Sequence, residues 1–246
     1  MKYKIIIMIP ARMESTRFPG KPLAPIEGIP MVVYCAKTAI ATGLDVFVCT
    51  DSKEIRTVCN LYNISCILTD EASTGTDRIA QALKGINTDY VINLQGDEPL
   101  VDTDSLKLMI DMISILEKNE NKIITGISSL ESAEACDPNN VKCAFIEKES
   151  KVQYLSRQPL LNNDLNSYGP SYFKQIGLYA MSKKTLYEFA SLKEGSLEKA
   201  EKVELLRWIE NGYELLGCKL NCESISVDTP ADLVNVLSKL KNIKSI

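Results

Sequence analysis

Apolar and polar positions follow two different periods along the first half of the chain. Short, nearly continuous apolar runs, such as residues 4–10 (KIIIMIP), are typical of strands buried on both faces. Between them lie longer segments with apolar residues three and four positions apart, such as residues 31–43 (MVVYCAKTAIATG), which are typical of amphipathic helices. This alternation predicts a mostly parallel central sheet with helices on both faces, and ligands bound beyond the carboxyl ends of its strands.

The pattern changes after about residue 130. Alternating runs predict further strands at residues 141–147, 151–156 and 173–182, with a polar loop at 161–171. A single helix is predicted over residues 196–212, with Gly212 as its stop signal. The tail predicts a strand, a turn, a segment in which Asp228 ends a strand, and a last helix that starts at Thr229-Pro230.

The composition narrows the classes of function. The 246 residues carry a net charge of −4, so no general basic field exists, and we expect no binding to nucleic acid or to an anionic membrane. The apolar start is too short for the core of a signal peptide, and no run of about 18 apolar residues follows it. We therefore expect a cytoplasmic protein.

The chain contains eight cysteines and no histidine. The cysteines form no CxxC pair and lie mostly in apolar segments, so we expect reduced core thiols rather than disulfides or a metal cluster. The lack of histidine excludes Ser-His-Asp and Cys-His nucleophilic sites and zinc sites built on imidazole. A metal, if used, is expected to be a hard, oxygen-liganded ion such as Mg²⁺.

The segment at residues 9–23 (IPARMESTRFPGKPL) places Arg12, Arg17 and Lys21 just beyond the first predicted strand. It is not a P-loop, because Pro22 follows the Gly-Lys pair and no glycine stands five residues before Gly20. Its cations can still hold phosphate through charge-assisted hydrogen bonds. The alternative is a solvated surface loop with scattered cations.

Two carboxylates follow strand-like segments elsewhere. Residues 91–100 (VINLQGDEPL) deliver Asp97 at the end of an apolar run, and residues 225–233 (ISVDTPADL) deliver Asp228 before a helix. Each is commonplace alone, and Asp228 is equally a candidate helix cap. Together they are candidate ligands for a metal held against phosphate oxygens.

These segments belong to an ordered set of motifs that resembles the 3-deoxy-manno-octulosonate cytidylyltransferases, the CMP-Kdo synthetases. In chain order the motifs are IPAR…STRFPGKPL, TGTDR, NLQGDEP, VK, YLSR, IGLY, LE…E…VELLR and VDTP. Each motif is weak by itself, but the ordered set spans nearly the whole chain and is highly specific.

The resemblance implies an α/β, Rossmann-like nucleotidyltransferase fold with a smaller α+β dimerisation and sugar-binding subregion, usually as a homodimer. We expect a single domain over residues 1–246, with its core at about 1–130 and 213–246 and the subregion at about 131–212. The implied reaction transfers CMP from CTP to the anomeric hydroxyl of a 2-keto-3-deoxy acid sugar, Kdo or a close analogue. Pyrophosphate is released, Mg²⁺ is the cofactor, and the product serves surface polysaccharide synthesis, as in lipopolysaccharide.

The resemblance also assigns site residues by motif. The CTP-binding set is Ala11, Arg12, Ser15, Arg17, Lys21, Thr74, Gly75, Thr76, Arg78, Gln95 and Gly96. The sugar-binding set is Gln95, Arg157, Gln175, Tyr179, Glu204 and Leu205. Asp97 and Asp228 would hold Mg²⁺, and with Lys21 and Arg12 they would be the catalytic residues.

Two positions depart from the family pattern. The family usually has His before LGxY and Gln in EQLR, where this chain has Gln175 and Leu205. One hypothesis is therefore a sugar altered at one or more hydroxyls, because a buried hydrogen-bonding site discriminates strongly between such substrates. The other is that both positions tolerate change without contacting the sugar. A different acid sugar, such as a nonulosonic acid, and a non-catalytic nucleotide-binding paralogue are the remaining alternatives.

Overall fold

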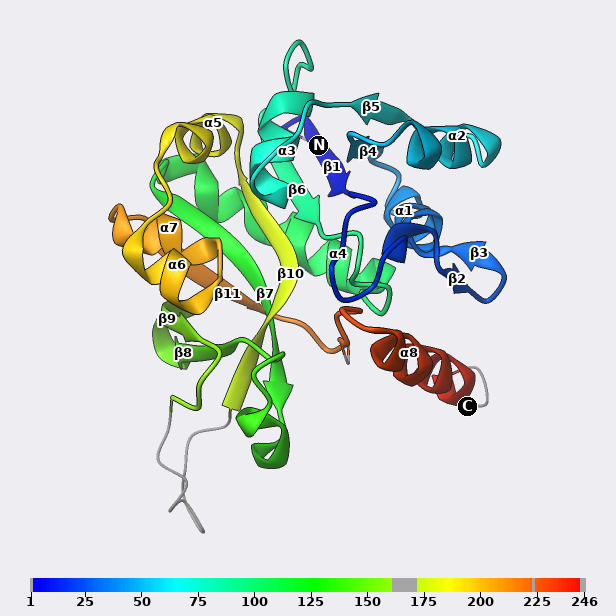
Figure 1. Cartoon of the computed structure of the whole chain (residues 1–246). Helices are drawn as coiled ribbons and strands as arrows, with labels where there is room; N and C mark the ends of the chain where they lie inside the picture. The colour runs from blue at the N-terminus through cyan, green and yellow to red at the C-terminus, as the bar shows by residue number, and fades with distance from the viewer. Residues whose placement is uncertain (1, 161–171, 223, 244–246) are drawn as a thin grey trace.

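The computed structural model describes residues 2–160, 172–222 and 224–243 and contains a nine-stranded sheet between two groups of helices (Figure 1). The polar loop predicted at residues 161–171 lies outside the described residues. The strands of this sheet are β1 (Ile5–Pro10), β4 (Asp45–Thr50), β5 (Cys66–Leu68), β6 (Tyr90–Leu94), β7 (Lys122–Leu130), β8 (Lys142–Ile146), β9 (Lys151–Ser156), β10 (Tyr172–Ser182) and β11 (Glu214–Lys219).

Helices follow most of the strands of the first half, as the periodicity predicts. The α-helices are α1 (Met31–Ile40), α2 (Lys53–Leu61), α3 (Gly75–Ala82), α4 (Thr103–Met112), α5 (Lys183–Ser191), α6 (Ser196–Glu201), α7 (Leu205–Glu210) and α8 (Pro230–Ile243). Short 3₁₀ turns are η1 (Lys21–Leu23), η2 (Ile113–Lys118), η3 (Ser132–Cys136) and η4 (Glu147–Glu149), and β2 (Pro25–Ile26) with β3 (Ile29–Pro30) forms a small hairpin. No helix within the described residues has both the length and the apolar character needed to span a membrane.

The strand order is β5-β4-β1-β6-β10-β7-β11-β9-β8. β5, β4, β1 and β6 run parallel to one another, as do β7 and β11. β10 runs antiparallel to both β6 and β7, between which it lies, so the sheet is mixed rather than mostly parallel. The reason is topological: the chain enters the centre of the sheet late, after β9, and in the opposite direction to its neighbours.

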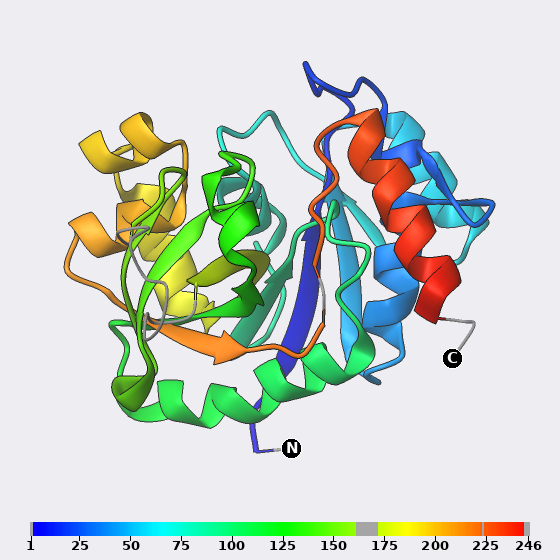
Figure 2. The ribbon, with the colours of Figure 1, turned by 90° about the horizontal axis from the view of Figure 1, so that it is seen from below.

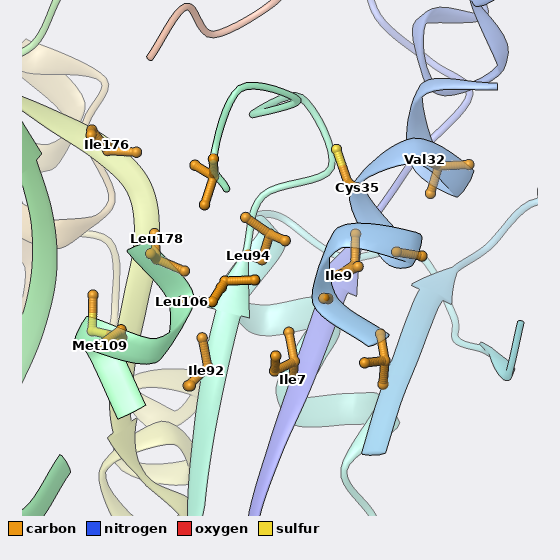
Figure 3. Packing of buried hydrophobic residues seen from close by; sticks show 14 of the residues in the cluster. Ile7, Ile9, Val32, Cys35, Ile92, Leu94, Leu106, Met109, Ile176 and Leu178 are labelled. Atoms are coloured by element: carbon orange, nitrogen blue, oxygen red, sulfur yellow. The ribbon is translucent and has the colours of Figure 1, made fainter. Parts of the chain in front are cut away.

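Each buried strand faces two hydrophobic cores. In β1, Ile7 and Ile9 pack with α1 and α4 in one core, whereas Ile6 and Met8 pack with α3, α5 and α7 in the other. Figure 3 shows the first core, with Ile7, Ile9 and the side chains of β6 and β10 between α1 and α4. The view from below places α8 beside α1 on one side of the sheet and α5 to α7 on the other (Figure 2). These two faces explain why the strand reads as a continuous apolar run.

The prediction of a single helix over residues 196–212 is wrong. The chain forms α6 and α7 instead, separated by residues 202–204, of which Lys202 adopts a left-handed conformation with φ 55°. The break turns α7 back toward α6, so that Arg207 pairs with Glu198 in the buried interior.

The strand predicted to end at Asp228 is also absent. Residues 224–228 belong to no sheet, and the amide of Val227 donates to the carbonyl of Asp97 at 2.9 Å. This hydrogen bond joins two segments that lie far apart in the sequence, beyond the carboxyl end of β6.

Candidate functional site

The cation-rich loop after β1 lines a cleft of about 860 Å³, called the first cleft here. Gly20 takes a left-handed conformation with φ 73°, which favours glycine, and directly precedes η1. Its carbonyl accepts a hydrogen bond from Leu23, which closes the turn. All five residues predicted from this loop, Ala11, Arg12, Ser15, Arg17 and Lys21, line the first cleft.

Lys21 lies between the two predicted metal carboxylates. Its Nζ is 2.6 Å from Asp97 Oδ2 and 3.5 Å from Asp228 Oδ1, while Arg17 lies 3.0 Å from Asp228 Oδ2. Burial alone would lower the pKa of Lys21, but the negative charges of Asp97 and Asp228 outweigh it and raise the pKa above its usual value. The lysine is therefore a fixed positive charge at neutral pH.

The two carboxylates form a donor set that suits a hard cation. Asp97 and Asp228 both lie within reach of a single ammonium nitrogen, and both line the first cleft. No group of three or more His, Cys, Asp or Glu that could hold a metal exists among the described residues. Two carboxylates suffice for Mg²⁺, which keeps several waters and takes further oxygens from phosphate.

The start of α3 also lines the first cleft. Thr74 caps this helix, accepting a hydrogen bond from the amide of Asp77 at 3.1 Å. A Cβ on Gly75 would lie 3.0 Å from the Gln95 side chain, so glycine permits the close approach of α3 to β6. Arg78 lines the cleft but is buried, with its guanidinium 2.5 Å from Asp51 Oδ2 and 2.7 Å from Thr69 Oγ1. The guanidinium of Arg78 is therefore held by Asp51 and Thr69.

A second cavity of about 480 Å³ adjoins the first cleft. The residues that line both are Arg12, Arg17, Ser73, Thr74, Gly75, Gln95, Asp97 and Asp228. Four of the six predicted sugar-binding residues line only this second cavity: Arg157, Gln175, Tyr179 and Glu204. The arrangement gives two adjacent compartments with a common wall of cations and carboxylates.

Arg157 and Gln175 both line the second cavity. The guanidinium of Arg157 donates to the carbonyls of Glu201, Pro138 and Lys202, so the backbone of the break between α6 and α7 fixes its position. Gln175 on β10 donates to the hydroxyl of Tyr179 at 3.2 Å. The departure from the family pattern at position 175 therefore lies in the cavity wall.

Glu204 faces the second cavity, but Leu205 and Thr76 do not line either compartment. Leu205 is fully buried in the core with α3 and α5, and Thr76 is equally buried. Thr76 donates to Glu204 Oε1 at 3.0 Å. Burial raises the pKa of Glu204, and the hydrogen bonds from Thr76 oppose the shift. Thr76 thus contacts a carboxylate of the second cavity, and the Leu205 side chain packs in the core.

The second cavity is also lined by Glu98, Lys174 and Ser224, to which the motifs assign no role. Glu98 is only 5% exposed and accepts hydrogen bonds from the amide of Gly177 and from Ser224 Oγ. Burial raises the pKa of Glu98 to about 7, with a contribution from the negative charge of Asp97. The sequence signal for Glu98 is its place in a run of two adjacent acids, 97–98, directly after a strand.

Comparisons with known proteins agree with this arrangement. The family described as Cytidylyltransferase matches residues 6–221. An 8-amino-3,8-dideoxy-manno-octulosonate cytidylyltransferase of Shewanella frigidimarina is 39% identical over 94% of this chain and 96% of its own. A 3-deoxy-manno-octulosonate cytidylyltransferase of Geotalea daltonii is 38% identical over 97% of this chain and 99% of its own.

A solved structure gives the same result for the fold. CMP:2-keto-3-deoxy-manno-octonic acid synthetase complexed with CTP superposes with a TM-score of 0.88 at 30% identity, covering 97% of this chain and 99% of that chain. The α/β nucleotidyltransferase fold implied by the motifs is thereby confirmed. The chain belongs to the cytidylyltransferase family and is a nucleotidyltransferase of the CMP-Kdo synthetase type.

Proposed function

We propose that this chain transfers CMP from CTP to the anomeric hydroxyl of a 2-keto-3-deoxy acid sugar, Kdo or a close analogue, and releases pyrophosphate. The observation that carries the proposal is the common wall of the two compartments, which contains Asp97 and Asp228, with Lys21 of the first cleft in contact with both carboxylates. A triphosphate in the first cleft and an acid sugar in the second cavity would bring the α-phosphorus and the hydroxyl to this wall.

In this mechanism the cations of the loop at residues 9–23 stabilise the negative charge of the triphosphate. Lys21 uses hydrogen bonds to Asp97 and Asp228 and retains a third N–H, which can donate to a phosphate oxygen. Arg12 and Arg17 line both compartments and would neutralise charge on the phosphates and on the leaving pyrophosphate. In-line attack then depends chiefly on positioning, and no covalent enzyme intermediate is needed.

The two carboxylates would hold Mg²⁺, and one of them would accept the proton of the attacking hydroxyl. Mg²⁺ bound by Asp97 and Asp228 would supply Lewis-acid stabilisation of charge on the phosphate oxygens. Both carboxylates line the second cavity as well, so either is placed to accept the proton of the attacking hydroxyl. The absence of histidine from the chain is therefore no obstacle.

A second candidate substrate is the 8-amino analogue of Kdo. Relatives of similar identity are named for the two sugars, with 39% for the Shewanella enzyme and 38% for the Geotalea enzyme. Gln175 in the cavity wall is the observation that favours an altered sugar, because its amide replaces the imidazole usual in the family. The non-catalytic paralogue is less favoured, since Lys21, Asp97 and Asp228 are all present. A nonulosonic acid is less favoured because the two relatives reported above are named for Kdo and its 8-amino analogue.

The test is pyrophosphate release by the purified protein with CTP and Mg²⁺, against Kdo, 8-amino-Kdo and nonulosonic acids. We expect release with Kdo or its amino analogue, and the ratio of their kcat/KM values identifies the preferred sugar. Release only with a nonulosonic acid would replace the substrate, and no release with any sugar would contradict the proposed reaction. The homodimer, the cytoplasmic location and the role in surface polysaccharide synthesis stay predictions.

A further inference from the structure

Glu98 connects three segments that meet at the common wall of the two compartments. It follows Asp97 in the turn after β6, and its side chain is buried within the protein. Its Oε1 accepts a hydrogen bond of 3.0 Å from the amide of Gly177 on β10. Its Oε2 accepts from Ser224 Oγ, in the segment of residues 224–228 that leads to Asp228.

Gly177 is bound at both of its backbone polar groups by the turn at residues 95–98. Its carbonyl accepts a hydrogen bond from the amide of Gln95 at 2.8 Å, and its amide donates to Glu98. The register of β10 against β7 shifts between Ile176 and Tyr179, where Gly177 lies. A Cβ at this position would lie 2.9 Å from Gln95 Cβ and 2.9 Å from Glu98 Cγ. The turn and the sugar-side strand are therefore in direct contact.

The third segment, residues 224–228, is held against the turn after β6 and against β10 by further hydrogen bonds. Val227 donates to the carbonyl of Asp97 at 2.9 Å, and Lys174 Nζ donates to the carbonyl of Ser224. The Glu98 carboxylate is the group that contacts both β10 and Ser224 from the turn that carries Asp97. Each of the three segments carries a residue of the proposed site: Asp97, Gln175 and Asp228.

We propose that Glu98 is a positioning residue, which sets the placement of the sugar-side wall of β10 relative to Asp97 and Asp228 through its hydrogen bonds to Gly177 and Ser224. This inference rests on the proposed function, because it assigns β10 to the acid sugar and the carboxylates to the phosphate side. Its physical basis is the sensitivity of transfer reactions to geometry, where a misplacement of about 1 Å costs about 100-fold in rate.

Three substitutions separate positioning from a role for the charge itself. Glu98→Gln keeps both contacts, since its Oε1 can accept from Gly177 and its Nε2 can donate to Ser224, whose hydroxyl both donates and accepts. Glu98→Leu has similar size and removes both contacts. Gly177→Ala keeps Glu98 but forces β10 away from the turn.

The matched control is Thr88→Val. Thr88 has the same 5% exposure as Glu98, and its hydroxyl lies within hydrogen-bond distance of two acceptors, the carbonyls of Lys4 and Tyr90, between which its one proton is shared. It lies at the opposite, amino-terminal end of β6 and lines neither compartment. Thr88→Val therefore measures how the loss of buried hydrogen bonding away from both compartments changes the Tm.

We would measure kcat and KM for each substrate, the Kd for CTP with Mg²⁺ by calorimetry, and the Tm of each variant. For Glu98→Leu and Gly177→Ala we expect kcat/KM for the sugar to fall by about 100-fold, with the CTP Kd unchanged within about threefold. Glu98→Gln should stay within about threefold of the wild type in every parameter. Thr88→Val should lower the Tm and leave the kinetics of the folded enzyme unchanged.

Other outcomes would overturn the inference. Loss of activity in Glu98→Gln equal to that in Glu98→Leu would show that the charge is needed, as for a metal ligand or a base. Unchanged sugar kinetics in Glu98→Leu would remove the positioning role. If Glu98→Leu does not fold, Ser224→Ala removes only one contact and should lower kcat/KM for the sugar by about 3- to 10-fold; no loss there would overturn the inference as well.

Hydrogen exchange distinguishes failure of this inference from failure of the proposed function. Glu98→Leu should speed exchange of the amides around Gly177, whereas Glu98→Gln and Thr88→Val should not. This readout needs no substrate, so it holds even if the wild type releases pyrophosphate with no sugar. Unchanged exchange in Glu98→Leu would show that Glu98 does not hold β10.

Discussion

At the scale of single residues, the site is defined by one ammonium group between two carboxylates from distant parts of the chain. Asp97 follows β6, Asp228 precedes α8, and Lys21 Nζ contacts both. The three side chains are only partly exposed, at 27%, 24% and 14% respectively, so their charges are screened less than those of a surface ion pair. Each carboxylate should therefore matter for turnover.

We expect Asp97→Asn and Asp228→Asn each to lower kcat/KM by at least about 100-fold, because Lewis-acid stabilisation is worth several kcal/mol. The Tm should change little, since neither side chain packs in a core. Pyrophosphate release at saturating CTP measures the effect. Asp104→Asn is the control, because the Asp104 side chain is 85% exposed and lies on α4. Full activity of Asp97→Asn with unchanged Mg²⁺ dependence would contradict the metal assignment.

The cysteines provide a separate residue-scale prediction. All eight are free thiols, and six of them are buried; Cys136 is exposed and Cys66 is partly exposed. Burial raises the pKa of the Cys35 and Cys143 thiols, whereas a hydrogen bond from Cys59 lowers the pKa of Cys66, assisted by the charge of Arg56. Because the thiolate is the reactive form, native protein should be alkylated first at these two accessible positions.

Alkylation of native protein with iodoacetamide, followed by mass spectrometry, measures this. We expect rapid labelling of Cys66 and Cys136, and labelling of the other six only after unfolding. Rapid labelling of Cys35, which lies in the first core below Gly96, would contradict the burial described here.

At the scale of elements, the break between α6 and α7 builds part of the second cavity. Arg207 donates to both oxygens of Glu198, at 2.7 and 2.6 Å, and its guanidinium lies 4.0 Å from the ring centre of Phe189. The break itself, at Lys202, supplies a carbonyl to Arg157 in the cavity wall. The ion pair thus stabilises the elements that hold this wall.

Arg207→Met should lower the free energy of unfolding by about 3–5 kcal/mol, because it leaves the Glu198 carboxylate buried without a partner. Denaturant unfolding measures the change. Lys107→Met is the matched control: Lys107 pairs with Asp104, but those side chains are 60% and 85% exposed, against 5% and 5% for the buried pair. The control should show little measurable change. Equal effects of the two substitutions would contradict a stabilising role for the buried pair.

The sequence predicts regular elements well and their breaks poorly. The apolar run of β1 and the periodicity of α1 are local properties, and both elements form as predicted. Lys202 takes a left-handed conformation that local propensity disfavours, because tertiary contacts of the following helix determine it. The place of β10 in the sheet depends equally on contacts between distant segments, which one sequence does not display.

The same distinction applies to the candidate site. The loop cations and the two carboxylates could be identified from their motifs, and the structure brings them together. The positions of Leu205 in the core and of Arg78 against Asp51 could not, because burial depends on packing between elements. The role proposed for Glu98 became visible only through its contacts with Gly177 and Ser224.

At the scale of the whole molecule, one continuous sheet carries both compartments. The parallel strands β1 and β6 deliver the cation loop and Asp97, while β10, between β6 and β7, delivers Gln175 and Tyr179. The two reactants would thus bind on neighbouring strands of the same rigid element, which suits a reaction that depends on positioning. The central claim is that these compartments together perform cytidylyl transfer.

The most direct test of that claim is pyrophosphate release by the purified, folded protein with CTP, Mg²⁺ and each acid sugar of the panel. We predict release that requires both CTP and an acid sugar of the Kdo type, and that is lost in Asp228→Asn. Absence of release with every sugar, by protein that is folded and binds CTP, would contradict the account.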